Sequence, residues 1–200
     1  LFIQKIGSVI LIQIYCSFWK HQDKILGKII RRICQEKFPQ KKITYLFQTR
    51  SKETKTDFRK LDNHGNLQPL NGDINLTIKE FGIHYHLTFG QFYDFGIFTD
   101  MSAIRLKVIP YLKKGDSTLN LFSYTGAFSL QALKAGCQEV HSVDLSPQYM
   151  NILNKNITDN NLDSTKHFSH VDSVLNKLNK FKKENKQFDH IIVDPPSAST

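Results

Sequence analysis

The chain has 200 residues, of which 40% are hydrophobic, so it can bury a substantial core and is not intrinsically disordered. Its formal net charge of +9 favours a polyanionic partner, nucleic acid first, over an unpartnered lysine-rich surface. The cysteines show neither a CxxC pair nor a metal-binding spacing with histidine, which argues against a disulfide framework and a metal site and favours a reducing, cytoplasmic setting.

Residues 8–80 are predicted to form a small α+β domain with an accessory or RNA-binding role. The apolar run Ile6–Phe18 is too short to span a bilayer and precedes no small-residue cleavage site, so we expect a buried strand and no membrane segment. Apolar residues at helical spacing predict a helix over Lys24–Cys34, and Ile43–Gln48 is typical of a second strand. The polar run Thr49–Asn75 is expected to be a loop.

A β-hairpin is predicted next. The segments Leu76–Glu80 and Ile83–Phe89 alternate apolar and polar residues, and Gly82 lies between them. His84 and His86 fall on one face of this hairpin, but no third ligand accompanies them, so a metal site is not expected.

The segment Phe95–Arg105 is a candidate lid over a pocket. It is apolar up to Asp100 and then enters a helix that we predict over Ala103–Leu112. An aspartate near the start of a helix and an arginine within it are also ordinary helix features. Capping and flanking of the helix is therefore an equal alternative for Asp100 and Arg105.

From Ser117 onward, strands and helices alternate regularly, which predicts an α/β domain with a Rossmann-like, doubly wound sheet within residues 81–200. The expected strands are Leu119–Phe122, Glu139–Asp144, Phe168–Val171 and Phe188–Val193. Gly136 should end one helix, and Ser146 with Pro147 should begin the next. Polar residues follow these strands at the edge where ligands bind in this architecture.

The turn from Phe122 to Gly126 is the first candidate ligand site. Ser123, Tyr124 and Thr125 place hydroxyl groups around a single glycine, whereas the dinucleotide fingerprint uses several glycines that let backbone amides reach a pyrophosphate. We therefore expect a cofactor without phosphate groups. An ordinary strand-to-helix connection is the alternative for this stretch taken alone.

Acidic residues mark the ends of the later strands. A carboxylate at Asp144 is placed to accept hydrogen bonds from the ribose hydroxyls of a nucleoside cofactor, and Asp172 from an exocyclic amine, although each could simply cap a helix. Asp194 precedes Pro195 and Pro196, which stop the last strand. The resulting stiff corner is able to orient a planar base, with a plain turn as the alternative.

Three runs in combination, LNLFSYTGAFSLQALKAG, SVDLSPQYMNILNKNITDNNL and DPPS, preceded by FGIFTDMSAIR, resemble the class I S-adenosylmethionine-dependent methyltransferases that modify large-subunit (23S) ribosomal RNA. The chain is similar in particular to the family that contains a cytosine-C5 enzyme and the guanine-N7 domain of a bifunctional relative. The resemblance covers residues 76–200. Val9–Gln48 is similar to the small domain that precedes the catalytic domain in that family.

The resemblance implies S-adenosyl-L-methionine as the cofactor and a base of RNA, in ribosomal RNA, as the substrate. The residues that it implies for cofactor binding are Asp100, Arg105, Phe122, Ser123, Tyr124, Thr125, Gly126, Asp144, Leu145, Asp172 and Ser173. Those that it implies for the reacting region are Asp194, Pro195 and Pro196. The chain departs from the family pattern at Ser102, where the family has an arginine, and at Ala198, where it tends to have an aromatic residue.

The methylated atom depends on the nucleophile. Methylation of cytosine C5 requires a thiolate near the methyl donor, but Cys137 begins the second strand, away from the cofactor, and Cys16 and Cys34 lie in the small domain. We expect either a nucleophile beyond Thr200, together with the second half of the sheet, or a product other than 5-methylcytosine. Two other functions stay open: a non-catalytic RNA-binding protein with this fold, and a methyltransferase for a small molecule or a protein.

Overall fold

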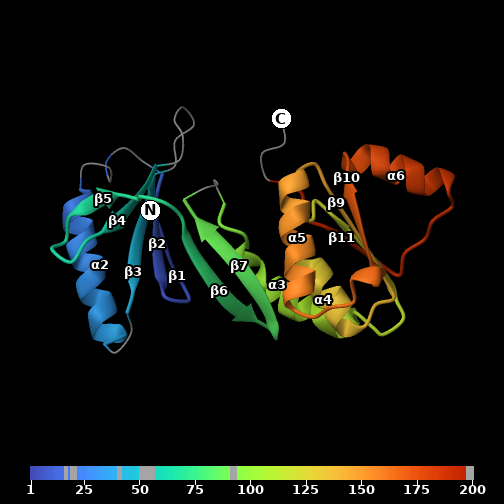
Figure 1. The fold of residues 1–200 in the computed structure, drawn as a ribbon, viewed down its shortest axis with the longest axis horizontal. Coiled ribbons are helices and arrows are strands. Elements are labelled where there is room, and N and C mark those ends of the chain that lie inside the picture. The colour runs from blue at the N-terminus through green and yellow to red at the C-terminus, as the bar shows by residue number, and fades with distance from the viewer. Residues whose placement is uncertain (16–17, 19–21, 40–41, 50–56, 91–93, 197–200) are drawn as a thin grey trace. The chain divides into compact units, whose positions relative to one another are not determined.

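The computed structural model describes residues 1–15, 18, 22–39, 42–49, 57–90 and 94–196 (Figure 1). The chain divides into two compact units, one of Leu1–Ile78 with His86–Phe95 and the other of Lys79–Tyr85 with Gly96–Thr200. This division passes through the predicted hairpin instead of following residue 80. Independent domains over residues 8–80 and 81–200 stay a prediction.

Among its described residues, the first unit has a five-stranded mixed sheet. In sheet order the strands are β1 (Phe2–Ile6), β2 (Val9–Ile14), β3 (Thr44–Thr49), β4 (Asp57–Leu61) and β5 (Leu67–Pro69), and the helix is α2 (Asp23–Lys37). β2 and β3 are parallel and the other neighbours antiparallel. One apolar cluster joins Leu26 and Ile30 of α2 to Ile12 of β2 and Phe47 of β3, and it confirms the strands and the helix predicted in this region.

The predicted loop over Thr49–Asn75 was wrong, because β4 and β5 lie within it. Phe58 and Leu61 are buried and β4 pairs with β3, so tertiary burial decides the conformation of this polar stretch. Asp62 closes the turn between β4 and β5: its Oδ1 accepts hydrogen bonds from two backbone amides of the turn, each at 2.8 Å. These hydrogen bonds, that from Asn66 foremost, hold the pKa of Asp62 below its ordinary value.

The predicted hairpin is confirmed. β6 (Ile74–Glu80) and β7 (Ile83–Phe89) form a two-stranded sheet. Phe81 and Gly82 between them have φ values of 48° and 80°, the left-handed backbone that suits a tight turn between twisted strands.

The second unit has a parallel sheet in the order β10-β9-β8-β11 among its described residues. Its strands are β8 (Ser117–Leu121), β9 (Glu139–Asp144), β10 (His167–Val171) and β11 (His190–Val193), and they alternate with α4 (Ala127–Ala135), α5 (Pro147–Asp159) and α6 (Val174–Lys183). The chain runs from β8 outward to β10 and then returns to the other side of β8. This order confirms the predicted Rossmann-like α/β sheet.

The shorter helical segments are η1 (Thr99–Met101), α3 (Ser102–Val108), η2 (Ile109–Tyr111) and η3 (Ser164–Lys166). The helix predicted over Ala103–Leu112 is shorter than expected, because α3 ends just before Pro110, which has no N–H to donate. Gly136, Ser146 and Pro147 end and begin their helices as predicted. Within the described ranges, no helix has the length and apolarity needed to cross a membrane.

The turn between β8 and α4 has an unusual backbone. Phe122, Tyr124 and Gly126 have φ values of 58°, 50° and 79°, and left-handed backbone costs a residue other than glycine about 1–2 kcal/mol. Neighbouring groups hold the turn: the backbone N–H of Ser123 donates to the carbonyl oxygen of Val143 at 3.0 Å, and that of Gly126 donates to the carbonyl oxygen of Ser123 at 2.8 Å. A Cβ on Gly126 would lie 2.1 Å from the Leu153 side chain of α5, so only glycine fits.

Buried and partly buried histidines lie on both faces of the β9–β10 pair. His141 Nδ1 lies 2.8 Å from His170 Nε2, and Phe181 of α6 packs edge-on against both rings. His167, on the opposite face, lies 2.9 Å from the hydroxyl of Ser142. Burial lowers the pKa of His167 and of His170 to about 4. The positive charge of His141 acts in the same direction on both, and the lysines of α6 add to the effect on His170.

We expect the free energy of unfolding to fall as the pH decreases from about 6.5 to about 4. His167 and His170 are neutral in the fold over this window but bind protons in the unfolded chain, so protonation favours unfolding. Denaturant titrations across this pH range measure the slope. His170→Gln should make the decline shallower, and His64→Gln, an exposed position in the first unit, should not; equal slopes in the two variants would contradict the assignment.

Gly126→Ala should lower the free energy of unfolding by about 2–5 kcal/mol, because left-handed backbone and overlap with Leu153 add together. Gly115→Ala is the matched control: Gly115 has a φ of 92°, and nothing lies within 4 Å of the position of its Cβ. The control should therefore lose only about 1–2 kcal/mol. Thermal and denaturant unfolding measure both losses. An equal loss of unfolding free energy in the two variants would refute this account.

Candidate active site

The predicted site residues follow the strands of the second unit at one edge of its sheet. Because the strands are parallel, their carboxyl ends lie on the same side. The loops at this edge carry Phe122–Gly126 after β8, Asp144 and Leu145 at the end of β9, Asp172 and Ser173 after β10, and Asp194, Pro195 and Pro196 after β11. The structure thus brings together these residues, which lie far apart in the sequence.

Asp144 connects the end of β9 to the turn after β8. Its Oδ2 accepts a hydrogen bond from the backbone N–H of Tyr124 at 2.8 Å, and its Oδ1 accepts one from Ser146 at 3.0 Å. Each carboxylate oxygen can accept further hydrogen bonds. Asp144 is therefore held in a fixed orientation and still has acceptor capacity for a ligand.

Asp172 and Ser173 begin α6. The Ser173 hydroxyl caps the helix by accepting from the backbone N–H of Asn176 at 3.1 Å, and Oδ1 of Asp172 accepts from the N–H of Ser173 at 2.7 Å. The capping alternative is thus present in the structure at these positions. Leu145, by contrast, is 73% exposed beside Asp144, an unusual exposure for a leucine and one that leaves an apolar surface at the edge of the sheet.

The segment that precedes α3 is tied to the β8–α4 turn. The backbone N–H of Gly96 donates to the hydroxyl of Tyr124 at 2.8 Å, and the hydroxyl of Thr125 donates to the carbonyl oxygen of Gly96 at 2.6 Å. The ring of Tyr124 also contacts the rings of Phe98 and Tyr149. The centroid of the Tyr124 ring lies 4.9 Å from that of Phe98 and 4.4 Å from that of Tyr149. Sequence reasoning missed Tyr149 and included Phe98 only as part of the candidate lid Phe95–Arg105, because nothing in either segment shows that these rings meet Tyr124.

Ser123 is the member of the turn with an unmet hydrogen bond. Its side chain is 6% exposed, and its hydroxyl has no partner among the described residues. A buried polar group without a partner is costly, so such groups are usually satisfied or functional. A hydroxyl-bearing turn beside a fixed carboxylate fits a nucleoside cofactor without phosphate groups.

Asp194 lies in an acidic environment. Partial burial raises the pKa of Asp194, and the negative charge of Asp100 raises it further, whereas the positive charge of Arg105 acts in the opposite direction. Asp100 and Arg105 are therefore the charged groups of the second unit that act on Asp194. Pro195 and Pro196 follow Asp194 with exposed side chains, and the predicted continuation of the corner at Ser197 and Ala198 lies outside the described residues.

Arg105 occupies a different environment from that expected for a helix-flanking residue. Its side chain is 1% exposed and forms an ion pair with Glu80, with 2.6 Å between Nε and Oε2. Its Nη1 also donates to the carbonyl oxygen of Phe98 at 3.0 Å. Direct binding of the cofactor by Arg105 stays a prediction, but these contacts already occupy its guanidinium.

The described cysteine of the second unit is buried away from this edge. Cys137 precedes β9, at the opposite end of the strand from Asp144, and its sulfur contacts the carbonyl oxygen of Lys113 at 3.6 Å. Burial raises the pKa of Cys34 and of Cys137. Cys137 is thus not placed as a nucleophile at this edge, Cys34 belongs to the first unit, and Cys16 lies outside the described residues.

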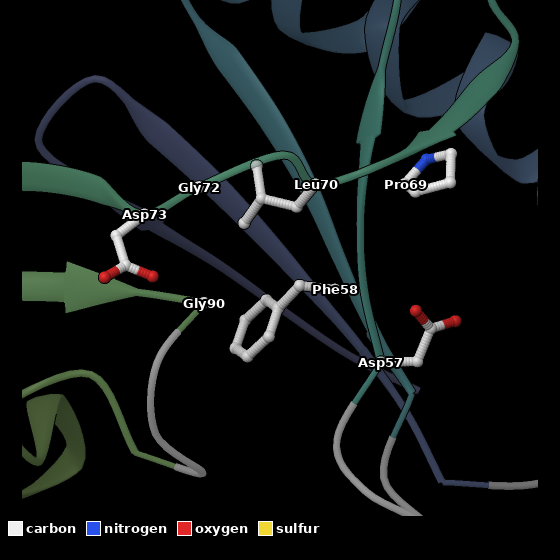
Figure 2. Close-up of a pocket in the computed structure, with 7 residues that line it drawn as sticks. All are labelled: Asp57, Phe58, Pro69, Leu70, Gly72, Asp73 and Gly90. Atoms are coloured by element: carbon white, nitrogen blue, oxygen red, sulfur yellow. The ribbon is translucent and has the colours of Figure 1, made fainter.

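A separate pocket of about 330 Å³ lies in the first unit (Figure 2). Its lining residues are Asp57, Phe58, Pro69, Leu70, Gly72, Asp73 and Gly90, and the side chains of Phe58 and Leu70 lie between the two aspartates in Figure 2. It contains none of the predicted site residues. Within the described ranges, no group of three or more His, Cys, Asp or Glu residues is placed to hold a metal ion.

Comparisons with known proteins give consistent matches. Residues 103–200 match the family model described as conserved hypothetical protein 95. The chain is 32% identical over 181 residues to ribosomal RNA large subunit methyltransferase K/L of Buchnera aphidicola subsp. Acyrthosiphon pisum, which covers 86% of this chain and 24% of that protein. It is 38% identical over 121 residues to ribosomal RNA large subunit methyltransferase I of Yersinia pseudotuberculosis, covering 60% of this chain and 30% of that protein.

Among solved structures, one described as a putative methyltransferase complexed with S-adenosylhomocysteine matches with a TM-score of 0.78 and 26% identity, covering 99% of this chain and 48% of that one. The chain thus spans 24% and 30% of the length of the two curated relatives and about half of the solved chain. These matches confirm the resemblance predicted from the sequence: the chain has the Rossmann-like fold of the S-adenosylmethionine-dependent methyltransferases and is similar in sequence to those named for large-subunit ribosomal RNA.

Proposed function

We propose that this protein transfers a methyl group from S-adenosyl-L-methionine to a base of RNA, in large-subunit ribosomal RNA. The observation that carries the proposal is the placement of a hydroxyl-rich turn, a fixed carboxylate at Asp144 and the Asp194 corner at the same edge of a parallel sheet. The names of the curated relatives support the ribosomal substrate.

The residues at this edge suit the cofactor part by part. The remaining lone pairs of Asp144 would accept from the two ribose hydroxyls, and the buried hydroxyl of Ser123 would meet a polar group of the methionine moiety. Leu145 offers an apolar surface to the adenine ring, and Asp172 an acceptor to its amine. When bound, S-adenosylmethionine supplies an electrophilic methyl group next to a positively charged sulfur.

Asp194 is the residue that we assign to the substrate base. Its raised pKa reflects burial and the neighbouring Asp100, so its carboxylate gains from a hydrogen-bond donor or a positive charge placed beside it. An amine or a protonated ring nitrogen of a base is such a group. Pro195 and Pro196 stiffen the backbone there, so Asp194 contributes by orienting the base toward the methyl group.

The charge of the chain supports an RNA partner. Its formal net charge is +9, although the site itself is rich in carboxylates. RNA would thus be attracted by the protein as a whole, while the acidic edge receives the cationic cofactor. For a ribosomal substrate we propose that this activity is cytoplasmic.

Asp144→Asn should weaken binding of S-adenosylhomocysteine by about tenfold or more, because hydrogen bonds to a charged acceptor are each worth about 1.5–3 kcal/mol. Isothermal calorimetry on the full-length protein measures this change. Asp57→Asn, in the first unit, is the matched control and should bind like the unmodified protein. Absence of binding by the unmodified protein, or equal affinity in the Asp144 variant, would overturn the assignment of the cofactor site.

Asp194→Asn should reduce methyl incorporation into purified large-subunit ribosomal RNA by about 10²-fold, the size typical of losing one preorganised electrostatic contact. Binding of S-adenosylhomocysteine should stay within about threefold of normal, because Asp194 is assigned to the base rather than to the cofactor. Labelled cofactor and purified RNA provide the assay. RNA binding with a steep salt dependence but no methyl incorporation by the unmodified protein would favour a non-catalytic RNA-binding function instead.

A further inference from the structure

We propose that Arg105 is a positioning residue, which holds Gly96–Asp100 against the β8–α4 turn through its buried ion pair with Glu80. This inference rests on the proposed function and refines it, because the resemblance implied that Arg105 binds the cofactor directly. On this proposal the arginine acts on the cofactor through the protein backbone.

The guanidinium of Arg105 is committed to groups of the second unit. Its Nε and Nη2 donate to the two carboxylate oxygens of Glu80 at 2.6 and 2.9 Å, and its Nη1 donates to the carbonyl oxygen of Phe98 at 3.0 Å. The group also lies 6.0 Å from the ring centroid of Phe128. A bidentate pair fixes both the distance and the orientation of its partners, so Glu80 already occupies the Nε–Nη2 edge with which this guanidinium would otherwise pair the carboxylate of a ligand.

Glu80 is well suited to hold this charge. Burial of its carboxylate acts to raise the pKa of Glu80, but hydrogen bonds from Arg105 and Ser102 outweigh it and keep the pKa below its ordinary value. Ser102 is the residue that replaces the arginine of the family pattern. In this chain it completes the hydrogen bonding of Glu80, which gives the departure from the family pattern a structural role.

Two sets of contacts connect the ion pair to the turn after β8. The first is the hydrogen bond to the carbonyl oxygen of Phe98, whose ring contacts Tyr124 at 4.9 Å. The second is the pair of hydrogen bonds by which Gly96 meets the hydroxyls of Tyr124 and Thr125. Because the backbone of Tyr124 also donates to Asp144, a shift of this segment would disturb both the turn and the carboxylate.

The two roles of Arg105 predict different results with two ligands. S-adenosylhomocysteine carries an amino acid carboxylate, and 5′-methylthioadenosine lacks it. If Arg105 binds that carboxylate directly, its loss weakens binding of the first compound only. If Arg105 is a positioning residue, its loss weakens binding of both compounds, and so does the loss of its partner Glu80.

The test measures the affinity of both ligands by calorimetry for the full-length protein and for Arg105→Lys, Glu80→Gln and the double variant. We expect each single change to weaken both ligands by about tenfold, with the double variant no weaker than either single one, because all three remove the same bidentate contact. Glu139→Gln is the matched control, since it breaks another partly buried ion pair, with Lys186, that lies outside the site. It should lower the unfolding temperature and leave both affinities unchanged.

A loss confined to S-adenosylhomocysteine in Arg105→Lys, with Glu80→Gln binding normally, would overturn the proposal in favour of direct binding. Normal affinities in both single variants would also overturn it. If the unmodified protein binds neither ligand, the proposed function fails, and hydrogen exchange then decides the inference alone. Faster exchange of the Gly96 amide in Arg105→Lys, with α6 unchanged, would support positioning, and unchanged exchange would refute it.

Discussion

Parallel pairing on both sides of β8 is the constraint on which the site depends. β8 pairs in register with β9 and with β11, so that Leu121 lies opposite Val143 on one side and opposite Val193 on the other. The residues that follow these three positions therefore emerge at one edge. A buried chain of hydrogen bonds supports this register, running from Asn120 through Ser129 and Ser142 to His167 at 2.9, 2.7 and 2.9 Å. Such a network is favourable only when each member keeps its partner, so it disfavours a shifted register.

The turn after β8 uses this scaffold to maintain an unfavourable backbone. Left-handed conformations at Phe122 and Tyr124 persist because the sheet, α5 and the segment at Gly96 each contact the turn. The same conformations leave backbone amides free to bond with the carboxylate of Asp144 and with neighbouring carbonyl groups. A turn held from several sides is preorganised, so a ligand need not pay to order it.

Charge is distributed unevenly between the site and the rest of the molecule. The chain is basic overall, yet Asp100, Asp144, Asp172 and Asp194 all belong to the candidate active site. For the proposed reaction this arrangement separates two tasks. Long-range attraction of a polyanion comes from the net charge, whereas short-range recognition of a cationic cofactor and of base amines comes from fixed carboxylates. The positive charge of Arg105 does not neutralise these aspartates, because it is paired with Glu80.

Local sequence determined the parts of this protein that depend on neighbouring residues. Hydrophobic periodicity identified the strands and helices of the second unit, because an element that buries one face repeats its apolar residues at the period of its backbone. Gly136, Ser146 and Pro147 marked the ends of helices for local steric and hydrogen-bonding reasons. Polar residues at successive strand ends identified the edge of the sheet before its strand order was known.

Tertiary structure decided what depends on contacts distant in sequence. β4 and β5 form in a polar stretch because β3 offers them hydrogen bonds and an apolar face. Arg105 and Glu80 meet only when the end of β6 and α3 are folded together, so a sequence pattern identified the arginine and could not show its partner. The contacts of Tyr124 with Phe98 and Tyr149 arise in the same way. Sequence alone therefore indicated the candidate site residues, and the fold decided which groups they face, because pairing partners are selected by packing in space and not by spacing along the chain.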